Sequence, residues 1–227
     1  MIKAIVIGAS GGIGGALADA LEARGADVIR LSRSSDPPLD LDDDGSIAAA
    51  AAALADRAPF DLILIATGLL HGPGVSPEKS YRQIEGAAFD RLFRVNATGP
   101  ALVMRHFLPL LARDRRSVMA ALSARVGSIG DNRLGGWVGY RSAKAALNQI
   151  IRTLAIELAR SHPNAILAGL HPGTVDTGLS APFQRNVAAD KLFTPEESAA
   201  RLIEVIDGLV QADSGGCFDF AGKPIAP

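Results

Sequence analysis

The chain has 227 residues, of which 48% are hydrophobic, enough apolar material for one α/β domain with a large core. Its formal net charge of -1 gives no reason to expect nucleic acid or an anionic membrane as a partner, and no run approaches the length of a membrane span. The single cysteine, Cys217, forms no internal disulfide and belongs to no metal-ligand spacing, which suits a reducing compartment. We predict one cytoplasmic domain, residues 1–227, without a metal site or signal peptide.

Short β-branched runs alternate with longer alanine- and leucine-rich stretches, which predicts a Rossmann-type, doubly wound parallel sheet with helices on both faces. About seven strands are expected, at Ile2–Ile7, Asp27–Leu31, Leu39–Leu41, Leu62–Ala66, Ser117–Leu122, Ala165–Leu170 and Gly216–Phe220. Helices are expected at Gly12–Arg24, Ser46–Arg57, Phe89–Leu111, Val138–Arg160 and Pro195–Leu209. The two longest loops, Gly68–Gln83 and His171–Phe193, each follow a strand's carboxyl end and should therefore border the ligand site.

A glycine-rich turn follows the first predicted strand and opens the first predicted helix. Gly8 permits a tight turn, Gly12 lets the backbone approach a pyrophosphate, and Gly14 lets the helix pack close to the strand. A purely structural turn could carry the same letters, but the strand–turn–helix context favours a dinucleotide site at the helix N-terminus. The residues predicted to bind there are Gly8, Ser10, Gly11, Gly12, Ile13 and Gly14.

The end of the second predicted strand points to the choice of cofactor. Ser32 stands where NAD-selective proteins carry an acid for the ribose 2′-hydroxyl, and Arg33 follows it. A guanidinium can pair with a 2′-phosphate, so the sequence favours NADP(H), with NAD(H) the weaker alternative. Arg33 could instead be a solvated loop charge, and Asp36 is close enough in sequence to neutralise it.

Tyr140 and Lys144 lie four residues apart on a strongly helical stretch, so they share a face. A neighbouring ammonium favours the phenolate, which should lower the tyrosine pKa and give a general acid/base. Such a pair by itself is commonly a helix surface pair. Its place after a glycine turn, an asparagine-bearing helix and a serine at a strand end makes it informative.

These motifs, together with Val95-Asn96-Ala97-Thr98-Gly99 and the Pro172–Thr177 segment, resemble the short-chain dehydrogenase/reductase family along essentially the whole chain. The stretch from Ser123 to Asn148 is similar to its C-factor-like and Sniffer-like carbonyl reductase branch. The resemblance implies an NADP(H)-dependent oxidoreductase that interconverts a carbonyl and an alcohol by nicotinamide hydride transfer. Tyr140 would then be the general acid/base, Lys144 would hold the nicotinamide ribose, and Asn96 would hold a water in the proton relay.

The resemblance also implies further cofactor contacts and an assembly. Asp40 would accept from the adenine amino group, Leu41 would line its pocket, and Gly68 would approach the cofactor by its backbone. Contacts to the nicotinamide are implied for Pro172, Gly173, Val175 and Thr177. The long predicted helices would pack against symmetry mates in a homodimer or homotetramer.

The sequence departs from the family where a serine usually polarises the substrate carbonyl. Counting back from Gly127 places Ala124 there, with Ser123 one residue earlier. Successive strand residues point to opposite faces, so Ser123 can serve only if the strand end twists or holds a bulge. We expect Ser123 to do so, with Ser128 as a poorer candidate. The family's Asn-Asn-Ala-Gly segment is Ile65-Ala66-Thr67-Gly68 here, which loses both amides.

Two other functions compete with the reductase. A dinucleotide-binding signalling or redox-sensing protein with little turnover is compatible with Ala124 and with the C-factor resemblance. A sugar-nucleotide epimerase or dehydratase shares the Tyr-x-x-x-Lys spacing but needs a larger substrate domain. The apolar Thr174–Phe193 loop indicates a small-molecule substrate, partly hydrophobic, without naming it.

Overall fold

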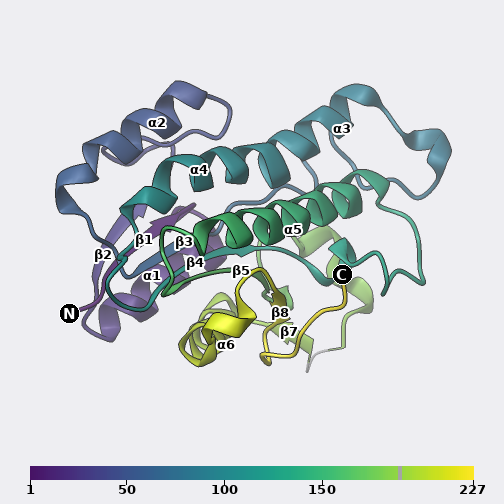
Figure 1. Ribbon diagram of the computed structural model, residues 1–227. Coiled ribbons are helices and arrows are strands. Elements are labelled where there is room, and N and C mark those ends of the chain that lie inside the picture. Colours follow the sequence, from purple (N-terminus) through teal and green to yellow (C-terminus); the bar gives the residue numbers. More distant parts are fainter. Residues whose placement is uncertain (189–190) are drawn as a thin grey trace.

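The computed structural model describes residues 1–188 and 191–227, and its centre is a six-stranded parallel sheet in the order β2-β1-β3-β4-β5-β8 (Figure 1). The strands are β1 (Lys3–Ile7), β2 (Asp27–Leu31), β3 (Leu62–Ile65), β4 (Ser117–Leu122), β5 (Ala165–His171) and β8 (Cys217–Asp219). β6 (Thr174–Val175) and β7 (Leu192–Phe193) form a separate two-stranded pair. The central strands read as nearly unbroken apolar runs because helices cover both faces of a parallel sheet.

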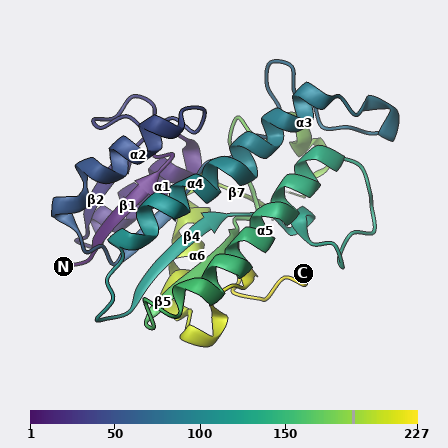
Figure 2. The ribbon, with the colours of Figure 1, turned by 45° about the horizontal axis from the view of Figure 1, so that its top comes forward.

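The helices form one layer on each face of the sheet (Figures 1 and 2). One face carries α2 (Asp44–Ala53), α4 (Gly99–Phe107) and α5 (Val138–Leu158), and the other carries α1 (Gly12–Ala23) and α6 (Pro195–Gly208). α3 (Gly86–Phe93) continues into α4 through a π-helical turn, Arg94–Thr98. The doubly wound fold predicted from the sequence is confirmed.

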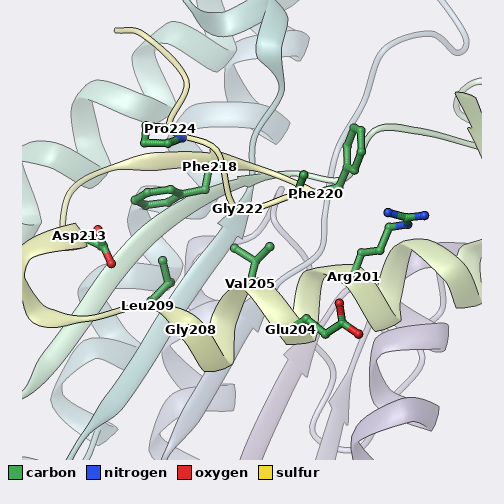
Figure 3. Close-up of a pocket in the computed structure, with 11 residues that line it drawn as sticks. Arg201, Glu204, Val205, Gly208, Leu209, Asp213, Phe218, Phe220, Gly222 and Pro224 are labelled. Atoms are coloured by element: carbon green, nitrogen blue, oxygen red, sulfur yellow. The ribbon is translucent and has the colours of Figure 1, made fainter.

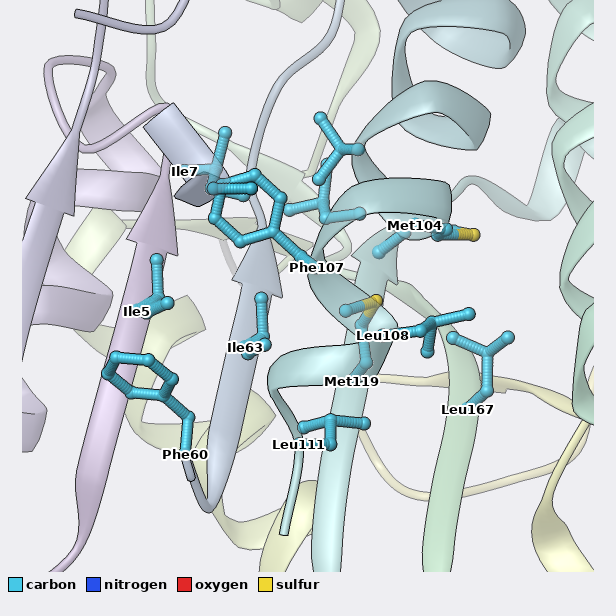
Figure 4. Packing of buried hydrophobic residues seen from close by; sticks show 14 of the residues in the cluster. Ile5, Ile7, Phe60, Ile63, Met104, Phe107, Leu108, Leu111, Met119 and Leu167 are labelled. Atoms are coloured by element: carbon cyan, nitrogen blue, oxygen red, sulfur yellow. The ribbon is translucent and has the colours of Figure 1, made fainter. Parts of the chain in front are cut away.

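The larger core fills the space between the sheet and the layer of α2, α4 and α5. Figure 4 shows Phe107 and Met104 of α4 in one cluster with Ile63 and Met119 of the strands, and all four side chains are buried. Each such side chain contributes about 1.5–3 kcal/mol through removal of apolar surface from water. This packing fixes α4, and with it the π-helical turn that precedes α4.

One predicted strand, Leu39–Leu41, is wrong, because this segment is a loop. Its backbone bonds locally: the Leu39 N–H donates to the Ser32 carbonyl (2.8 Å) and the Asp40 N–H to the Ser46 hydroxyl (2.9 Å). Leu39 and Leu41 are nevertheless buried. The alternating pattern therefore arises from two leucine side chains that anchor a loop on the core, and the loop pairs with no strand of the described residues. The other predicted strands and helices are present, with ends shifted by at most four residues, but the single helix predicted over Phe89–Leu111 is divided into α3, the π-helical turn and α4.

The chain order reverses beside β1, because β2 lies on one side of β1 and β3 on the other. In open α/β sheets, such a switch point leaves a crevice at the carboxyl ends of the strands, where ligands bind. The loops after β1, β3, β4 and β5 all leave this edge. Within the described residues, no helix combines the length and apolar character that crossing a bilayer requires.

Candidate active site

The glycine turn has geometry that only glycine permits at two positions. Gly8 has a φ of +88°, in the region that favours glycine. A Cβ on Gly14 would lie 2.2 Å from the Gly8 carbonyl oxygen, so any side chain there would push α1 away from β1. A Cβ on Gly12 would lie 2.9 Å from the Thr177 methyl carbon. The turn and the Pro172–Thr177 segment therefore meet.

The N-terminus of α1 has the properties of an anion site. Gly11 is its N-cap residue, no side chain caps the first turn, and that turn holds no acidic residue. The free N–H groups and the helix dipole therefore meet no competing negative charge. Beside the turn, the Thr67 hydroxyl is buried and has no hydrogen-bond partner among the described residues. Both observations fit a ligand that brings phosphate oxygens and further acceptors to this edge.

A cavity of about 460 Å³ extends from the glycine turn to the end of β2. It collects seven of the predicted cofactor-binding residues: Gly8, Ser10, Gly11, Arg33, Asp40, Leu41 and Gly68. Arg33 is exposed, and within residues 1–188 and 191–227 it forms no ion pair, with Asp36 or with any other carboxylate. Its charge is available to a ligand in this cavity.

Asn96 lies in the π-helical turn and is fully buried. Its side-chain amide donates to the carbonyl oxygens of Leu69 (2.7 Å) and Leu92 (3.0 Å), and its Oδ1 accepts from the Leu69 N–H (3.1 Å). These bonds tie the loop after β3 to the helix layer. A Cβ on Gly68 would be 3.6 Å from Asn96 Oδ1 and 3.9 Å from Lys144 Nζ, so the structure brings these three predicted residues together.

Tyr140 and Lys144 share a buried face of α5, with Lys144 Nζ 5.7 Å from the centre of the Tyr140 ring. Lys144 donates to the Leu122 carbonyl at the end of β4 (2.7 Å). Burial lowers the pKa of Lys144 to about 8 and raises the pKa of Tyr140 above its ordinary value. The predicted lowering of the tyrosine pKa is therefore not found: burial outweighs the neighbouring ammonium, and the phenol is protonated at neutral pH.

Glu78, in the loop after β3, caps the helix that carries this pair, and the sequence analysis missed it. Trp137, the N-cap residue of α5, has a φ of 53° and makes no side-chain cap. The buried Glu78 carboxylate instead accepts from the Gly139 N–H (3.2 and 3.3 Å), and the Glu78 carbonyl accepts from the Trp137 N–H (2.6 Å). A carboxylate at a helix N-terminus stabilises it, so Glu78 fixes the turn that presents Tyr140.

Ser123 and Ala124 point in different directions at the end of β4. The Ser123 hydroxyl donates to Asn148 Oδ1 (2.6 Å), whereas Ala124 packs in one apolar cluster with Tyr140. Both line the cavity beside Tyr140. Since the Ser123 proton already has a partner, this geometry counts against the predicted polarising role, which stays a prediction. Ser128 accepts from the Asp131 N–H (3.0 Å) and does not line this cavity.

The cavity beside Tyr140 has a volume of about 460 Å³ and an apolar body. Leu70, Trp137, Leu179 and Phe183 supply apolar surface, with Trp137 and Phe183 in edge-on contact. Seven predicted site residues also line it: Ile13, Ser123, Tyr140, Pro172, Gly173, Val175 and Thr177. Four others, Gly12, Gly14, Asn96 and Lys144, line neither of the two cavities, which meet at the glycine turn.

His171 ends β5 and also lines this cavity. Its Nδ1 is buried and has no hydrogen-bond partner among the described residues. Burial and the nearby Arg125 lower its pKa to about 4, so the imidazole is neutral at physiological pH. An imidazole with so low a pKa is a weak base.

A further hollow of about 410 Å³ lies between α6 and β8, away from this chemistry (Figure 3). Its walls include Phe218, Phe220 and Arg201, and it contains none of the predicted site residues. The Arg201 guanidinium makes cation–π contacts with the rings of Phe193 and Phe220, at 4.7 and 5.9 Å from their centroids. This hollow therefore belongs to the packing of the last strand.

Two curated relatives match much of the chain. The 1-hydroxy-2-glutathionyl-2-methyl-3-butene dehydrogenase of Rhodococcus sp. is 29% identical over 226 residues, 95% of each chain. The C-signal of Myxococcus xanthus is 33% identical over 142 residues, 63% of this chain and 80% of that protein. The second relative agrees with the C-factor-like resemblance of the sequence.

Solved structures share the fold over the full length. A Burkholderia multivorans protein assigned to the short-chain dehydrogenases/reductases, with bound NADP, is 26% identical with a TM-score of 0.83, covering 100% of this chain and 99% of that one. The carbonyl reductase Sniffer of D. melanogaster is 18% identical with a TM-score of 0.85, covering 100% of both chains. The short chain dehydrogenase family model matches residues 3–188, and on that match this chain belongs to the short-chain dehydrogenase/reductase family.

Proposed function

We propose that this protein is an NADP(H)-dependent oxidoreductase that interconverts a carbonyl and an alcohol, with Tyr140 as general acid/base. One observation carries the proposal: Tyr140, with the buried Lys144 beside it on α5, lines a cavity whose other wall is the Pro172–Thr177 segment, in contact with the glycine turn. The groups for proton transfer and for cofactor binding would thus lie together at the carboxyl ends of the strands. The Burkholderia relative with bound NADP supports the same cofactor here.

The residues present fit NADP(H), which when bound supplies or accepts the hydride. The uncapped N-terminus of α1 receives the pyrophosphate, and Arg33 binds the 2′-phosphate. Asp40 and Leu41 border the adenine, and Pro172, Gly173, Val175 and Thr177 hold the nicotinamide. The Thr67 hydroxyl, without a partner in the described part of the chain, gains one from the ligand.

In the reducing direction, Tyr140 would donate its phenolic proton to the oxygen of the carbonyl, and bound NADPH would supply the hydride. Burial keeps this proton on the phenol at neutral pH, the state that a general acid requires. Lys144 holds the ribose and, as an ammonium, stabilises the phenolate left behind. Asn96 braces the loop after β3 beside Lys144 and positions the water that returns a proton.

We expect NADPH to bind at least about tenfold more tightly than NADH, a difference of about 1.4 kcal/mol, because only NADPH carries the phosphate that Arg33 pairs with. Arg33→Ala should erase most of that preference and leave NADH affinity unchanged. Calorimetric titration of both cofactors measures this. Equal affinities in the unmodified protein would overturn the assignment to NADP(H).

Ser123→Ala and Ala124→Ser test which group polarises the carbonyl. Because the Ser123 hydroxyl donates to Asn148, we expect Ser123→Ala to change kcat by less than about threefold. Ala124→Ser adds a donor on the side of Tyr140 and should raise kcat about tenfold, a fraction of what an optimised oxyanion donor contributes. A hundredfold loss in Ser123→Ala would instead assign the role to Ser123.

The alternative is a dinucleotide-binding signalling or redox-sensing protein with little turnover, which the C-signal relative keeps in view. The buried Tyr140–Lys144 pair favours the enzyme, because a sensor has no need of a proton donor in a substrate-sized cavity. NADPH consumption across a panel of ketones, aldehydes and quinones separates the enzyme from the sensor.

A cytoplasmic location, a single domain over residues 1–227 and homo-oligomeric assembly stay predictions.

A further inference from the structure

Charge is distributed unevenly around the cavity beside Tyr140. Its body is apolar, but three arginines, Arg125, Arg133 and Arg141, contribute to its lining. Among the described residues, no aspartate or glutamate lines it. For a chain with a net charge of -1, a cavity wall with basic and no acidic side chains is a local property that its ligand should match.

The three arginines differ in how far their charge is already balanced. Arg125 pairs with Asp131 (3.2 Å) and with the buried Asp219 (2.9 Å), so its charge is neutralised. Arg141 is held only by neutral acceptors: its Nε donates to the Gly136 carbonyl (2.9 Å) and its Nη1 to the Val126 carbonyl (3.4 Å). Within residues 1–188 and 191–227 it has no carboxylate partner, so these bonds fix the guanidinium one residue after Tyr140 without cancelling its charge.

Arg133 supplies the second unbalanced charge, from the loop that leads into α5. In the part of the chain that the structure describes, it makes no hydrogen bond and no ion pair. It is exposed, and its neighbour Leu134, which also lines the cavity, is 93% exposed. Gly135 and Gly136, with φ of 64° and 69°, turn the chain directly after them. The cavity thus has an apolar body near Tyr140 and two uncompensated guanidinium groups in its lining.

We propose that the substrate is an apolar carbonyl or alcohol that also carries a carboxylate, bound by Arg141 and Arg133. This inference rests on the proposed function and names its substrate class. The apolar part packs against Trp137 and Phe183, and the carboxylate takes the planar N–H fork that a guanidinium offers. Arg141 is preorganised by its backbone contacts, so little side-chain freedom is lost when it binds.

Trp137 allows a binding test that does not depend on turnover. It is the only tryptophan of the chain and lines the cavity, so its fluorescence reports occupancy. The probes are 4-phenylbutanoate and its methyl ester, which differ in charge and by one methyl group, titrated into protein saturated with NADP⁺. We expect the acid to bind at least about tenfold more tightly than the ester. Equal affinities, or no binding of the acid, would overturn the inference.

Arg133→Gln should remove most of the preference for the acid and leave ester affinity unchanged, and Arg141→Gln should do the same. The matched control is Arg160→Gln, at the opposite end of α5, which should behave like the unmodified protein. A preference that persists in both variants would contradict the proposal. Arg133 has no partner in the described residues, so its replacement should not disturb folding.

Turnover separates this proposal from the oxidoreductase assignment on which it rests. The reducible pair is 3-benzoylpropanoate and its methyl ester, assayed with NADPH. We expect kcat/KM to be at least about tenfold higher for the acid, mainly through KM. Reduction of both at equal kcat/KM would refute the carboxylate site and keep the enzyme. Tight binding of the acid by Trp137 fluorescence, with no reduction of any carbonyl, would keep the anion site and refute the enzyme.

Discussion

Replacing Tyr140 by phenylalanine should leave the fold and NADPH binding intact and lower turnover of any accepted carbonyl by about 10²- to 10⁴-fold. The substitution removes one hydroxyl, which forms no hydrogen bond with the described residues and therefore leaves no buried group unpaired. The ring keeps its contacts with Trp137 and the surrounding apolar cluster. Steady-state kinetics and calorimetric NADPH titration on the same preparation measure the two effects.

Lys144→Ala provides the contrast, because it should damage both binding and turnover. Lys144 is 2% exposed and its ammonium donates to the Leu122 carbonyl, so its loss would remove the proposed ribose contact, a neighbour of the phenol and a structural hydrogen bond together. If Tyr140→Phe turned over substrate as well as the unmodified protein does, the proton-transfer mechanism would be wrong. The glycine turn and Arg33 would then support cofactor binding alone, and the signalling alternative would lead.

Gly14→Ala should weaken NADPH binding by at least about a hundredfold and destabilise the protein by about 3 kcal/mol or more. The new Cβ would lie 2.2 Å from the Gly8 carbonyl oxygen and 3.3 Å from Cβ of Ala66. The Gly8 carbonyl oxygen and carbonyl carbon belong to the backbone, so no change of side-chain rotamer can move them away. α1 must shift off β1, and its N-terminus then no longer points at the pyrophosphate.

Thermal unfolding with and without NADPH checks this prediction, with a fall in Tm of roughly 6–12 °C expected for a chain of this size. Gly208→Ala is the matched control, since it also adds a methyl group to a helix, at a position where the Cβ would meet nothing within 4 Å. Unchanged Tm and NADPH affinity in Gly14→Ala would show that the turn tolerates a side chain, contrary to the geometry.

The parts of the fold that the sequence predicts are those set by local patterns. Six strands read as apolar runs, and residues at their carboxyl ends meet because parallel strands share one edge. The glycine turn and the Tyr140–Lys144 pair are likewise local, four residues apart or fewer between neighbouring members. For the same reason the family and the fold class follow from short motifs in their order.

Features that depend on distant contacts were not predictable in this way. The Glu78 cap joins residues 61 positions apart, and nothing in the letters around Glu78 distinguishes it from a solvated loop charge. The partner of Ser123, Asn148, lies 25 positions away on α5. Its hydrogen bond, rather than the count back from Gly127, decides where the hydroxyl points. Leu39 and Leu41 are buried in a loop, so their alternation with Asp40 looks like that of a strand although no strand is formed.

The π-helical turn at Arg94–Thr98 constrains how the chain can be lengthened or shortened. Each residue of an α-helix turns the next side chain by about 100° around the helix axis. The π-helical turn holds one extra residue, so it changes by that angle the direction of Asn96 relative to the core-facing Met104 and Phe107. In a regular α-helix, either Asn96 could hydrogen-bond the loop after β3 or Met104 and Phe107 could face the core, but not both. A single-residue deletion between α3 and α4 should therefore be far less tolerated than one in an exposed loop, and homologues of different length should place their insertions elsewhere.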